Sequence, residues 1–220
     1  MNRPAMPSPI PAPHPTAGRR ANRRSAGRFP TLAVLALLMA PLTACNGPAE
    51  EPPLAGAAIG GDFTLIGKAG KTVHFHDFSG KWRIVYFGYS YCPDVCPLDL
   101  QHLMQGYHDF AKASPALARD VQPIFVTIDP ERDTPQKVGE YTANFGPELL
   151  GLTGTPAQIA STAGMWKVYY ARHDGKTPGS YLMDHSRAAY LLDRAGHPIA
   201  LLPSDQDGAA VAAELAKWVR

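Results

Sequence analysis

The sequence predicts an α/β domain over residues 61–220, in which helices cover both faces of a mixed central sheet. Two observations support this prediction. A buried apolar strand, an amphipathic helix and a second buried strand follow one another between residues 82 and 128. Such a unit requires a parallel strand pair with a right-handed crossover. A strand, a turn and a strand within residues 188–202 then add antiparallel strands to the sheet.

The first half of the domain begins with a predicted N-terminal hairpin, whose strands at 63–66 and 72–75 flank a glycine turn. Residues 82–89 form a nearly continuous apolar run, which is typical of a central strand buried on both faces. Pro97 suits the first turn of a helix. The apolar face of this helix consists of Leu100, Leu103, Met104, Tyr107, Phe110 and Ala111.

The second half continues with a buried strand at 123–128. Threonine followed by proline predicts helices over roughly 135–145 and 156–167, because threonine caps a helix and proline fits its first position. After the strand–turn–strand, a last helix places Val211, Leu215, Trp218 and Val219 on one face. This order of elements is consistent with a thioredoxin-like fold.

Residues 1–44 have a different composition and are predicted to be an export signal. A proline-rich start is followed by five arginines between Arg19 and Arg28, and no acidic residue precedes Glu50. An apolar run from Leu32 to Ala44 follows, and a basic segment before such a run is typical of a secretory signal. The run spans about 14 residues, whereas a membrane-spanning helix needs roughly 20.

The apolar run ends in Leu42-Thr43-Ala44-Cys45, which resembles the lipobox of bacterial lipoproteins. This resemblance implies that Cys45 is lipidated and becomes the first residue of the mature chain. The alternative is an uncleaved signal anchor in which Cys45 has no role. Residues 45–60 are rich in proline, alanine and glycine and are expected to form a flexible tether between membrane and domain.

The charge of the chain points away from nucleic acid. The whole sequence carries a net charge of +2, and residues 1–44 contain six arginines and no acid, so the remainder carries −4. The basic balance therefore belongs to the export signal, and no basic face for nucleic acid is predicted.

The segment Gly88-Tyr-Ser-Tyr-Cys92-Pro-Asp-Val-Cys96-Pro97 is the main candidate site. It lies where a central strand ends and a helix begins, which is where ligands bind in open α/β sheets. Thiolates are favoured near a helix N-terminus, and the thiolate is the form that attacks disulfides and binds metals. A Cys92–Cys96 disulfide is one interpretation, since an even cysteine pair in an oxidising compartment invites one.

Ligand counting favours copper as the metal for this pair. Three residues separate Cys92 from Cys96, which leaves room for two sulfurs to hold an ion. Soft thiolates select copper(I), zinc or iron–sulfur clusters. A structural zinc site needs four ligands, and an iron–sulfur cluster needs about four cysteines. Copper is satisfied by two sulfurs and an imidazole.

The histidine that would complete such a site is not determined by position alone. His74 and His76 alternate along a hairpin strand, and His102 and His108 occupy polar positions of the first predicted helix. His14 lies in the export segment and His197 in a turn. His185 stands immediately before a strand, where a loop histidine is more often exposed to solvent than bound to a metal.

Three blocks of the sequence resemble the Sco/SenC copper-binding proteins. They are residues 88–98, residues 126–135 with the sequence Val-Thr-Ile-Asp-Pro-Glu-Arg-Asp-Thr-Pro, and Asp184-His185-Ser186. They occur in the order of that family, over roughly residues 55–220. The resemblance implies a thioredoxin-like fold, a membrane anchor and one copper ion, as Cu(I) or Cu(II), bound by Cys92, Cys96 and His185.

The resemblance also implies a function outside the cytoplasm, in the bacterial periplasm or on the outer cell face. The expected role is a copper metallochaperone that assists assembly of the dinuclear copper centre in subunit II of cytochrome c oxidase. Other periplasmic copper chaperones are further expected partners. Many relatives carry a transmembrane helix where this chain carries a lipobox, a difference that changes the anchor and leaves the copper chemistry alone.

Two other functions remain open from the sequence. The first is a thiol–disulfide oxidoreductase that uses Cys92 and Cys96 to reduce the copper-ligating cysteines of the same client. The second is a copper-buffering or redox-sensing module without a dedicated client. His185 distinguishes a copper-binding function from the reductase, because a pure dithiol reductase needs no imidazole ligand.

Two acidic features accompany the cysteines. The carboxylates of Asp129-Pro-Glu-Arg-Asp133 could hold a hard metal, but turn formation and helix capping explain much of this segment. Asp184 is expected to orient the imidazole of its neighbour His185 as a hydrogen-bond partner behind the ligand. The alternative role of Asp184 is an ordinary loop turn.

Overall fold

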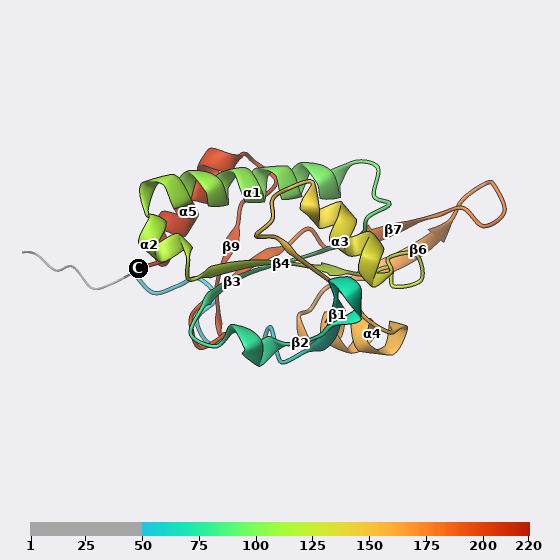
Figure 1. The fold of residues 1–220 in the computed structure, drawn as a ribbon, viewed down its shortest axis with the longest axis horizontal. Helices are drawn as coiled ribbons and strands as arrows, with labels where there is room; N and C mark the ends of the chain where they lie inside the picture. Colours follow the sequence, from blue (N-terminus) through green and yellow to red (C-terminus); the bar gives the residue numbers. More distant parts are fainter. Residues whose placement is uncertain (1–49) are drawn as a thin grey trace, which may run out of the picture. The chain divides into compact units, whose positions relative to one another are not determined.

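The computed structural model describes residues 50–220 (Figure 1). The predictions made for residues 1–44, including His14, and for Cys45 lie outside the described residues. Within residues 50–220, no helix combines the length and the apolar character needed to cross a membrane.

The predicted mixed sheet is present and has seven strands in the order β2-β1-β5-β4-β3-β8-β9. The central strands β3, β4 and β5 are parallel, and the other pairs are antiparallel. The predicted N-terminal hairpin is confirmed as β1 and β2, and β1 joins it to β5. The strands are β1 (Thr64–Gly67), β2 (Thr72–His74), β3 (Trp82–Gly88), β4 (Val121–Thr127), β5 (Leu150–Thr153), β8 (Ala189–Leu192) and β9 (Pro198–Leu202).

Helices cover both faces of this sheet, as predicted. In Figure 1, α1, α3 and α5 lie above the sheet and α4 lies below it. Thr134 and Thr155 cap α3 and α4 by accepting hydrogen bonds from the N–H groups of Lys137 and Gln158, both at 3.2 Å. The helices are α1 (Val95–Ala113), α2 (Pro115–Ala118), α3 (Pro135–Ala143), α4 (Pro156–Met165) and α5 (Gly208–Trp218), with short 3₁₀ turns at Lys68–Gly70 and Phe75–Phe78.

Alternation along β3 divides its side chains between the two faces of the sheet. The Tyr86 hydroxyl donates a hydrogen bond to Asp99 of α1, on one face. On the other face, the ring of Phe87 packs on Trp166 at a centroid distance of 5.7 Å. The end of β3 therefore presents Tyr86 and Gly88 to the first turn of α1, where the cysteines lie.

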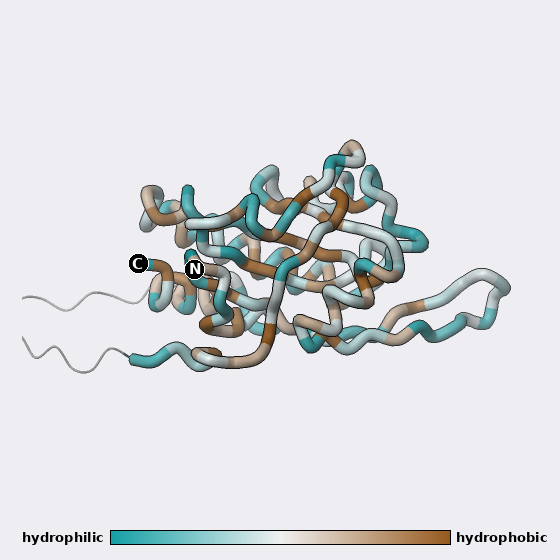
Figure 2. Tube along the Cα trace, turned by 90° about the horizontal axis from the view of Figure 1, so that it is seen from below, coloured by the Kyte–Doolittle hydropathy of each residue, from teal (hydrophilic) through white to brown (hydrophobic). Residues whose placement is uncertain are grey.

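A two-stranded hairpin made of β6 (Tyr170–Asp174) and β7 (Tyr181–His185) was not predicted from the sequence. Within the described residues, neither strand pairs with the seven-stranded sheet. Figure 2 shows the hairpin extending away from the layered part of the domain, with apolar residues mainly toward its base. His185, expected in a loop, is the last residue of β7.

The first described residues also contact the rest of the domain. The N–H of Leu54 donates to the carbonyl of Ile199 at 3.0 Å, and the N–H of Gly60 donates to Met165 at 3.1 Å. Ile59 packs on the core as well. Within the expected tether over 45–60, Leu54 and Ile59 therefore contact the packed domain, and the tether itself stays a prediction.

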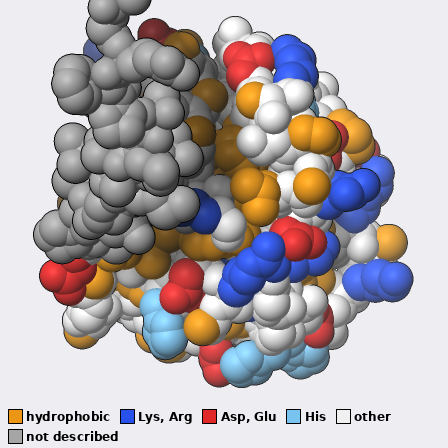
Figure 3. Space-filling view, turned by 90° about the vertical axis from the view of Figure 1, so that its left-hand side faces the viewer, with side chains coloured by type: hydrophobic (Ala, Val, Ile, Leu, Met, Phe, Trp, Pro, Cys, Tyr) orange, Lys and Arg blue, Asp and Glu red, His pale blue; other side chains and the backbone are white. Residues whose placement is uncertain are grey.

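The end of the domain that carries α2 has a mixed surface. On the visible part of this face, acidic and basic side chains are interspersed, and histidines lie along one margin (Figure 3). The cysteines lie at the other end of α1.

Candidate metal centre

The two cysteines lie on the connection from β3 to α1. Cys92 is half-buried in the loop, and Cys96 is fully buried in the first turn of the helix. The backbone N–H of Cys96 donates to the sulfur of Cys92 at 3.4 Å. The Cys92 sulfur thus accepts one of the free N–H groups at the helix N-terminus, where negative charge is favoured.

Gly88 at the end of β3 makes room for Cys96. A Cβ atom at this position would lie 3.1 Å from the Cys96 sulfur and 3.0 Å from the ring of Phe125. Any other residue would push the helix turn or the aromatic ring away. The glycine of the Gly88-to-Cys92 segment is therefore required by packing at the site.

His185 reaches the cysteines from the hairpin. Its Nε2 lies 3.0 Å from the sulfur of Cys96, and its Nδ1 lies 2.8 Å from the carbonyl oxygen of Ser186. Because a carbonyl only accepts hydrogen bonds, Nδ1 carries the ring proton, which leaves the Nε2 lone pair facing the sulfurs. The rings of Tyr86 and Tyr89 meet the imidazole edge-on, at centroid distances of 6.3 and 6.1 Å.

The three side chains form one cluster of potential ligands. The sulfurs of Cys92 and Cys96 and a ring nitrogen of His185 all lie within 4.8 Å of one another. In the described residues, this is the only group of three or more His, Cys, Asp or Glu side chains close enough to hold a metal ion. Two soft sulfurs and one imidazole suit copper, one protein ligand fewer than a structural zinc site uses and without the oxygen donors of a magnesium site.

The pKa values of the two thiols are shifted in opposite directions. A hydrogen bond between their sulfurs lowers the pKa of Cys92 against the opposing effect of burial, with smaller contributions from nearby backbone N–H groups. The same hydrogen bond, reinforced by burial, raises the pKa of Cys96. Both cysteines are free in this structure, and the two shifts favour the thiolate at half-buried Cys92 and the protonated thiol at buried Cys96. The predicted Cys92–Cys96 disulfide of the oxidised protein stays a prediction.

Buried carboxylates fix the loops around the cysteines. Asp133 is fully buried and accepts hydrogen bonds from the N–H of Ser90, at 2.9 Å, and from the hydroxyl groups of Ser90 and Thr127. Its role is thus to anchor the cysteine loop, beyond the turn formation expected from sequence. The contact spans 43 residues, and no local pattern indicates it.

Asp99 is a second buried carboxylate, which sequence reasoning missed. It accepts hydrogen bonds from the hydroxyl of Tyr86, at 2.8 Å, and from the guanidinium of Arg187. Burial raises the pKa of Tyr86, so its hydroxyl keeps the proton that it donates. An acidic residue on the apolar face of the predicted first helix, one turn after Cys96, is the signal that could have identified it.

The prediction for Asp184 is wrong. Its carboxylate pairs with Nε2 of His173 at 2.8 Å, and the Nδ1 partner of His185 is the Ser186 carbonyl. The reason is that His185 lies in a strand, where neighbouring side chains point to opposite faces. His173, for which no role is predicted from the sequence, lies exposed on β6.

The other histidines lie apart from the cluster. His74 and His76 are exposed, as expected. His102 lies in the first predicted helix, but its side chain is half-buried and its Nδ1 lies 2.8 Å from the carbonyl of Ser204. His108, also half-buried, lies 3.4 Å from Glu148.

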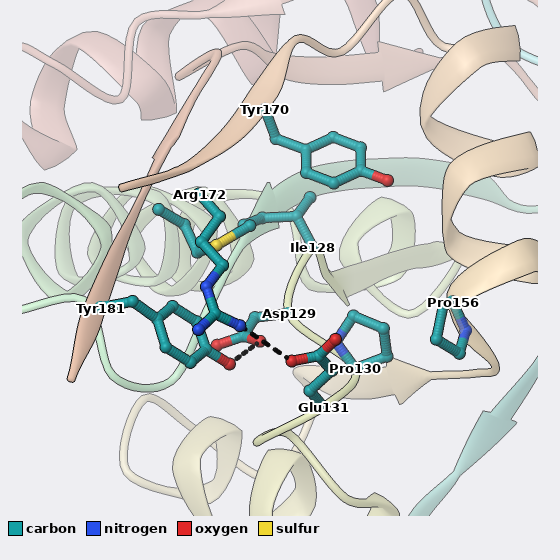
Figure 4. A pocket seen from close by; sticks show the side chains of 9 residues that line it. Ile128, Asp129, Pro130, Glu131, Pro156, Tyr170, Arg172 and Tyr181 are labelled. Atoms are coloured by element: carbon teal, nitrogen blue, oxygen red, sulfur yellow. Dashed lines mark hydrogen bonds and ion pairs between the residues drawn. The ribbon is translucent and has the colours of Figure 1, made fainter. Parts of the chain in front are cut away.

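A cavity of about 150 Å³ lies beside the centre, along the face of the hairpin that also carries His185. Figure 4 shows Tyr181 and Arg172 over the loop at 129–131, where the Tyr181 hydroxyl donates to Asp129 at 2.8 Å and Arg172 pairs with Glu131 at 3.2 Å. These contacts attach the base of the hairpin to the loop after β4. The backbone N–H of Met183 adds a hydrogen bond to the Tyr89 hydroxyl at 3.2 Å.

Curated relatives match this chain over most of the described domain. The mitochondrial SCO1 homolog 1 of Arabidopsis thaliana is 45% identical over 144 residues, which are 65% of this chain and 42% of that protein. The SenC protein of Rhodobacter capsulatus is 42% identical over 139 residues, which are 63% of this chain and 61% of that protein. The chain spans about half the length of several curated relatives that it matches.

Solved structures match more completely. The copper-bound ScoI of Arabidopsis thaliana is 39% identical, with a TM-score of 0.67, and the match covers 73% of this chain and 97% of that one. The copper-bound ScoI of Bradyrhizobium japonicum is 37% identical, with a TM-score of 0.66, and the match covers 73% of this chain and 99% of that one. The thioredoxin domain of a thiol–disulfide oxidoreductase from Bacteroides vulgatus is 16% identical, with a TM-score of 0.51, and the match covers 74% of this chain and 96% of that one. The thioredoxin-like fold predicted from sequence is therefore confirmed.

The family model described as SCO1/SenC matches residues 51–220, which is more than half of the chain. This match includes the loop with both cysteines, the segment after β4 and the histidine of β7. The resemblance seen in the three sequence blocks is thereby confirmed, and the chain belongs to the SCO1/SenC family.

Proposed function

We propose that this protein is a copper metallochaperone that binds one copper ion through Cys92, Cys96 and His185. The proposed client is the dinuclear copper centre in subunit II of cytochrome c oxidase. The observation that carries the proposal is the convergence of two sulfurs and a ring nitrogen within 4.8 Å. The copper-bound state of two ScoI relatives supports copper as the metal.

The donor set suits an ion that is held and then released. Two thiolates hold Cu(I), and the unprotonated Nε2 of His185 adds the nitrogen that Cu(II) prefers. Cys92 is half-buried while Cys96 is fully buried, so an incoming thiolate of the client has access from the Cys92 side. Copper is the cargo in this scheme, and exchange of one thiolate for another transfers it.

The proposed location is outside the cytoplasm, in the bacterial periplasm or on the outer cell face. The proposed anchor is a lipid on Cys45, after removal of residues 1–44. Support comes from the short apolar run and the lipobox in the sequence. Other periplasmic copper chaperones are the proposed source of the ion.

Metal analysis of the purified, reduced protein tests the proposal. We expect one copper per chain after addition of Cu(I) and removal of excess ion, and no comparable retention by a Cys92→Ser/Cys96→Ser variant. Zinc is offered at the same concentration for comparison, because two cysteines and a histidine can also hold zinc when water takes the fourth position. Retention of zinc in place of copper would contradict the proposal.

A thiol–disulfide oxidoreductase is the second candidate function, and the opposite pKa shifts of the two cysteines favour it. The Cys92 thiolate would attack a disulfide of the client and release one client thiolate. Cys96 would then lose its proton, displace the second client sulfur and leave a Cys92–Cys96 disulfide. The two electrons that reduce the client come from this dithiol.

The two candidates share a testable consequence. The oxidised protein should contain a Cys92–Cys96 disulfide and take up no Cu(I) until it is reduced, because bonded sulfurs offer no thiolate. Thiol counting before and after reduction, beside a copper titration, measures both properties. Equal Cu(I) uptake by oxidised and reduced protein would refute the prediction.

A further inference from the structure

An ion pair between a buried carboxylate and a partly exposed arginine joins the segment that carries His185 to the helix that carries Cys96. Asp99 lies one turn after Cys96 in α1 and is 0% exposed. Arg187 follows His185 by two residues, and its Nη2 and Nε donate to the two carboxylate oxygens of Asp99 at 2.6 and 3.0 Å. Two parallel charge-assisted hydrogen bonds of this kind fix orientation as well as distance.

The position of His185 depends on side-chain contacts that join its segment to the rest of the domain. The hairpin that carries it is not part of the seven-stranded sheet. On the side of the chain before His185, Met183 is held by the hydroxyl of Tyr89, and Tyr181 by Asp129. On the side after His185, Arg187 stands in the middle of the three-residue connection to β8 and holds this connection to α1.

A second contact leads from Asp99 to the imidazole. The Tyr86 hydroxyl donates to the same carboxylate, at 2.8 Å, and the Tyr86 ring meets His185 edge-on at an interplanar angle of 86°. Removal of Arg187 would leave a fully buried carboxylate with this hydroxyl as its remaining partner among the described residues. The backbone after His185 would then lose its hydrogen bonds to α1.

We propose that Arg187 is a positioning residue that holds Nε2 of His185 at the two sulfurs through Asp99, and thereby favours Cu(II) over Cu(I) at this site. This inference rests on the proposed copper function. Cu(I) is satisfied by two thiolates, whereas Cu(II) prefers a nitrogen donor. A displaced imidazole would therefore weaken Cu(II) binding and leave Cu(I) binding nearly unchanged.

The test compares the wild-type protein with Arg187→Met, which keeps much of the length of the side chain and removes its charge and donors. Cu(II) affinity is measured by titration of the thiolate–Cu(II) absorption, and Cu(I) affinity by anaerobic competition with a chelator. We expect Cu(II) affinity to fall about 10–100-fold, the usual effect of removing a partner behind a metal ligand. A selective tenfold loss of Cu(II) affinity raises the Cu(II)/Cu(I) potential of the site by about 59 mV.

The matched control is Arg194→Met. Arg194 forms an ion pair with Asp120 at 2.8 Å, and its side chain is 42% exposed against 41% for Arg187, but it lies in the turn between β8 and β9. This variant should keep both copper affinities. An equal change of selectivity in Arg194→Met would show that loss of any arginine ion pair is sufficient, and would overturn the proposal.

A double variant separates positioning from a general effect on the fold. In a His185→Ala background, Arg187→Met should cause no further loss of Cu(II) affinity, because Arg187 acts through the imidazole. Independent, additive losses would overturn the proposal. If Arg187→Met loses its helical circular dichroism, Arg187→Lys decides: a smaller selective loss of Cu(II) supports the proposal, and unchanged selectivity overturns it.

Failure of the two proposals can be distinguished. A wild-type protein without a thiolate–Cu(II) absorption would overturn the copper function and this inference together. A wild-type absorption with unchanged selectivity in Arg187→Met would overturn only the role of Arg187.

Discussion

At the scale of single residues, Cys92 and Cys96 differ because one lies in a loop and the other in a helix turn. The Cys92 sulfur accepts the N–H of Cys96 and is half-buried, whereas the Cys96 sulfur is buried against Gly88 at the end of β3. The sequence predicted the pair and the thiolate-favouring helix N-terminus. The difference between the two thiols depends on burial, which the spacing of the cysteines does not reveal.

This difference predicts the reactivity of the two thiols. A free thiol has a pKa of about 8.5 and loses reactive thiolate about tenfold per pH unit below that value. The lowered pKa of Cys92 should keep its alkylation rate constant between pH 8 and pH 6, whereas Cys96, with its raised pKa, should react far more slowly throughout. Mass spectrometry of the reduced protein after timed iodoacetamide pulses measures both rates. Faster labelling of Cys96, or a tenfold fall at Cys92 for each pH unit, would contradict this prediction.

Other residues of the site could not be predicted at this scale. Asp99 and Arg187 are 88 residues apart, and Ser90 and Asp133 are 43 apart. Their partners are set by the way the sheet brings α1, β7 and the loop after β4 together. His185 was identified from a family resemblance, since its own neighbours in the sequence indicate only a loop.

At the scale of elements, the strands and helices with a strong apolar pattern were predicted, and the weakly patterned ones were not. The buried run of β3 and the apolar face of α1 determine their own structure. By contrast, β5 is four residues long and contains a glycine, and β6 is mostly exposed, so neither carries a clear period. These two segments become strands because they pair with neighbouring strands, and the sequence of each segment alone does not contain that information.

The junction of β3 and α1 gives a prediction about stability. Gly88→Ala should reduce the free energy of unfolding by about 1–3 kcal/mol, because its Cβ would overpack the buried junction. The Cys96 sulfur, 3.1 Å from the new atom, should also shift, which would change the thiolate–Cu(II) absorption. Chemical denaturation and optical titration measure the two effects.

Gly164→Ala is the matched control for this substitution. Gly164 lies in α4, and apart from its chain neighbours and the backbone of its own helix, nothing lies within 4 Å of the place that its Cβ would take. Alanine there should raise the free energy of unfolding by about 0.5–1 kcal/mol, because it reduces the freedom of the unfolded chain. A Gly88→Ala variant as stable as the wild type, with an unchanged Cu(II) absorption, would show that the close packing at Cys96 has no consequence.

At the scale of the whole molecule, the domain holds its potential ligands from separate parts of the chain. The connection from β3 to α1 brings the cysteines, the hairpin brings His185, and the buried carboxylates Asp99 and Asp133 connect these parts to the rest of the domain. The layered domain that makes this possible was predicted from the sequence. The hairpin was missed, and with it the reason why Asp184 faces away from the imidazole.

The proposed attachment of this domain to a membrane gives a prediction for the full sequence. Cys45 should carry lipid at the N-terminus of the mature chain, with residues 1–44 removed, because the apolar run is short and ends in a lipobox. Mass spectrometry of the N-terminal peptide from a membrane fraction tests this. An unmodified Cys45 still joined to residues 1–44 would contradict it, and a Cys45→Ser variant is the control for the lipid signal.

The copper titration of His185→Ala is the most direct test of the three-ligand site. We expect this variant to lose most of its Cu(II) affinity, to show an altered thiolate–Cu(II) absorption and electron-spin resonance spectrum, and to keep Cu(I) binding by the two thiolates. His173→Ala, on the neighbouring strand of the same hairpin, and His102→Ala should leave the spectra unchanged, since both rings lie outside the cluster of Cys92, Cys96 and His185. Unchanged Cu(II) affinity and spectra in His185→Ala would remove this residue from the site and leave a dithiol whose chemistry is that of a reductase.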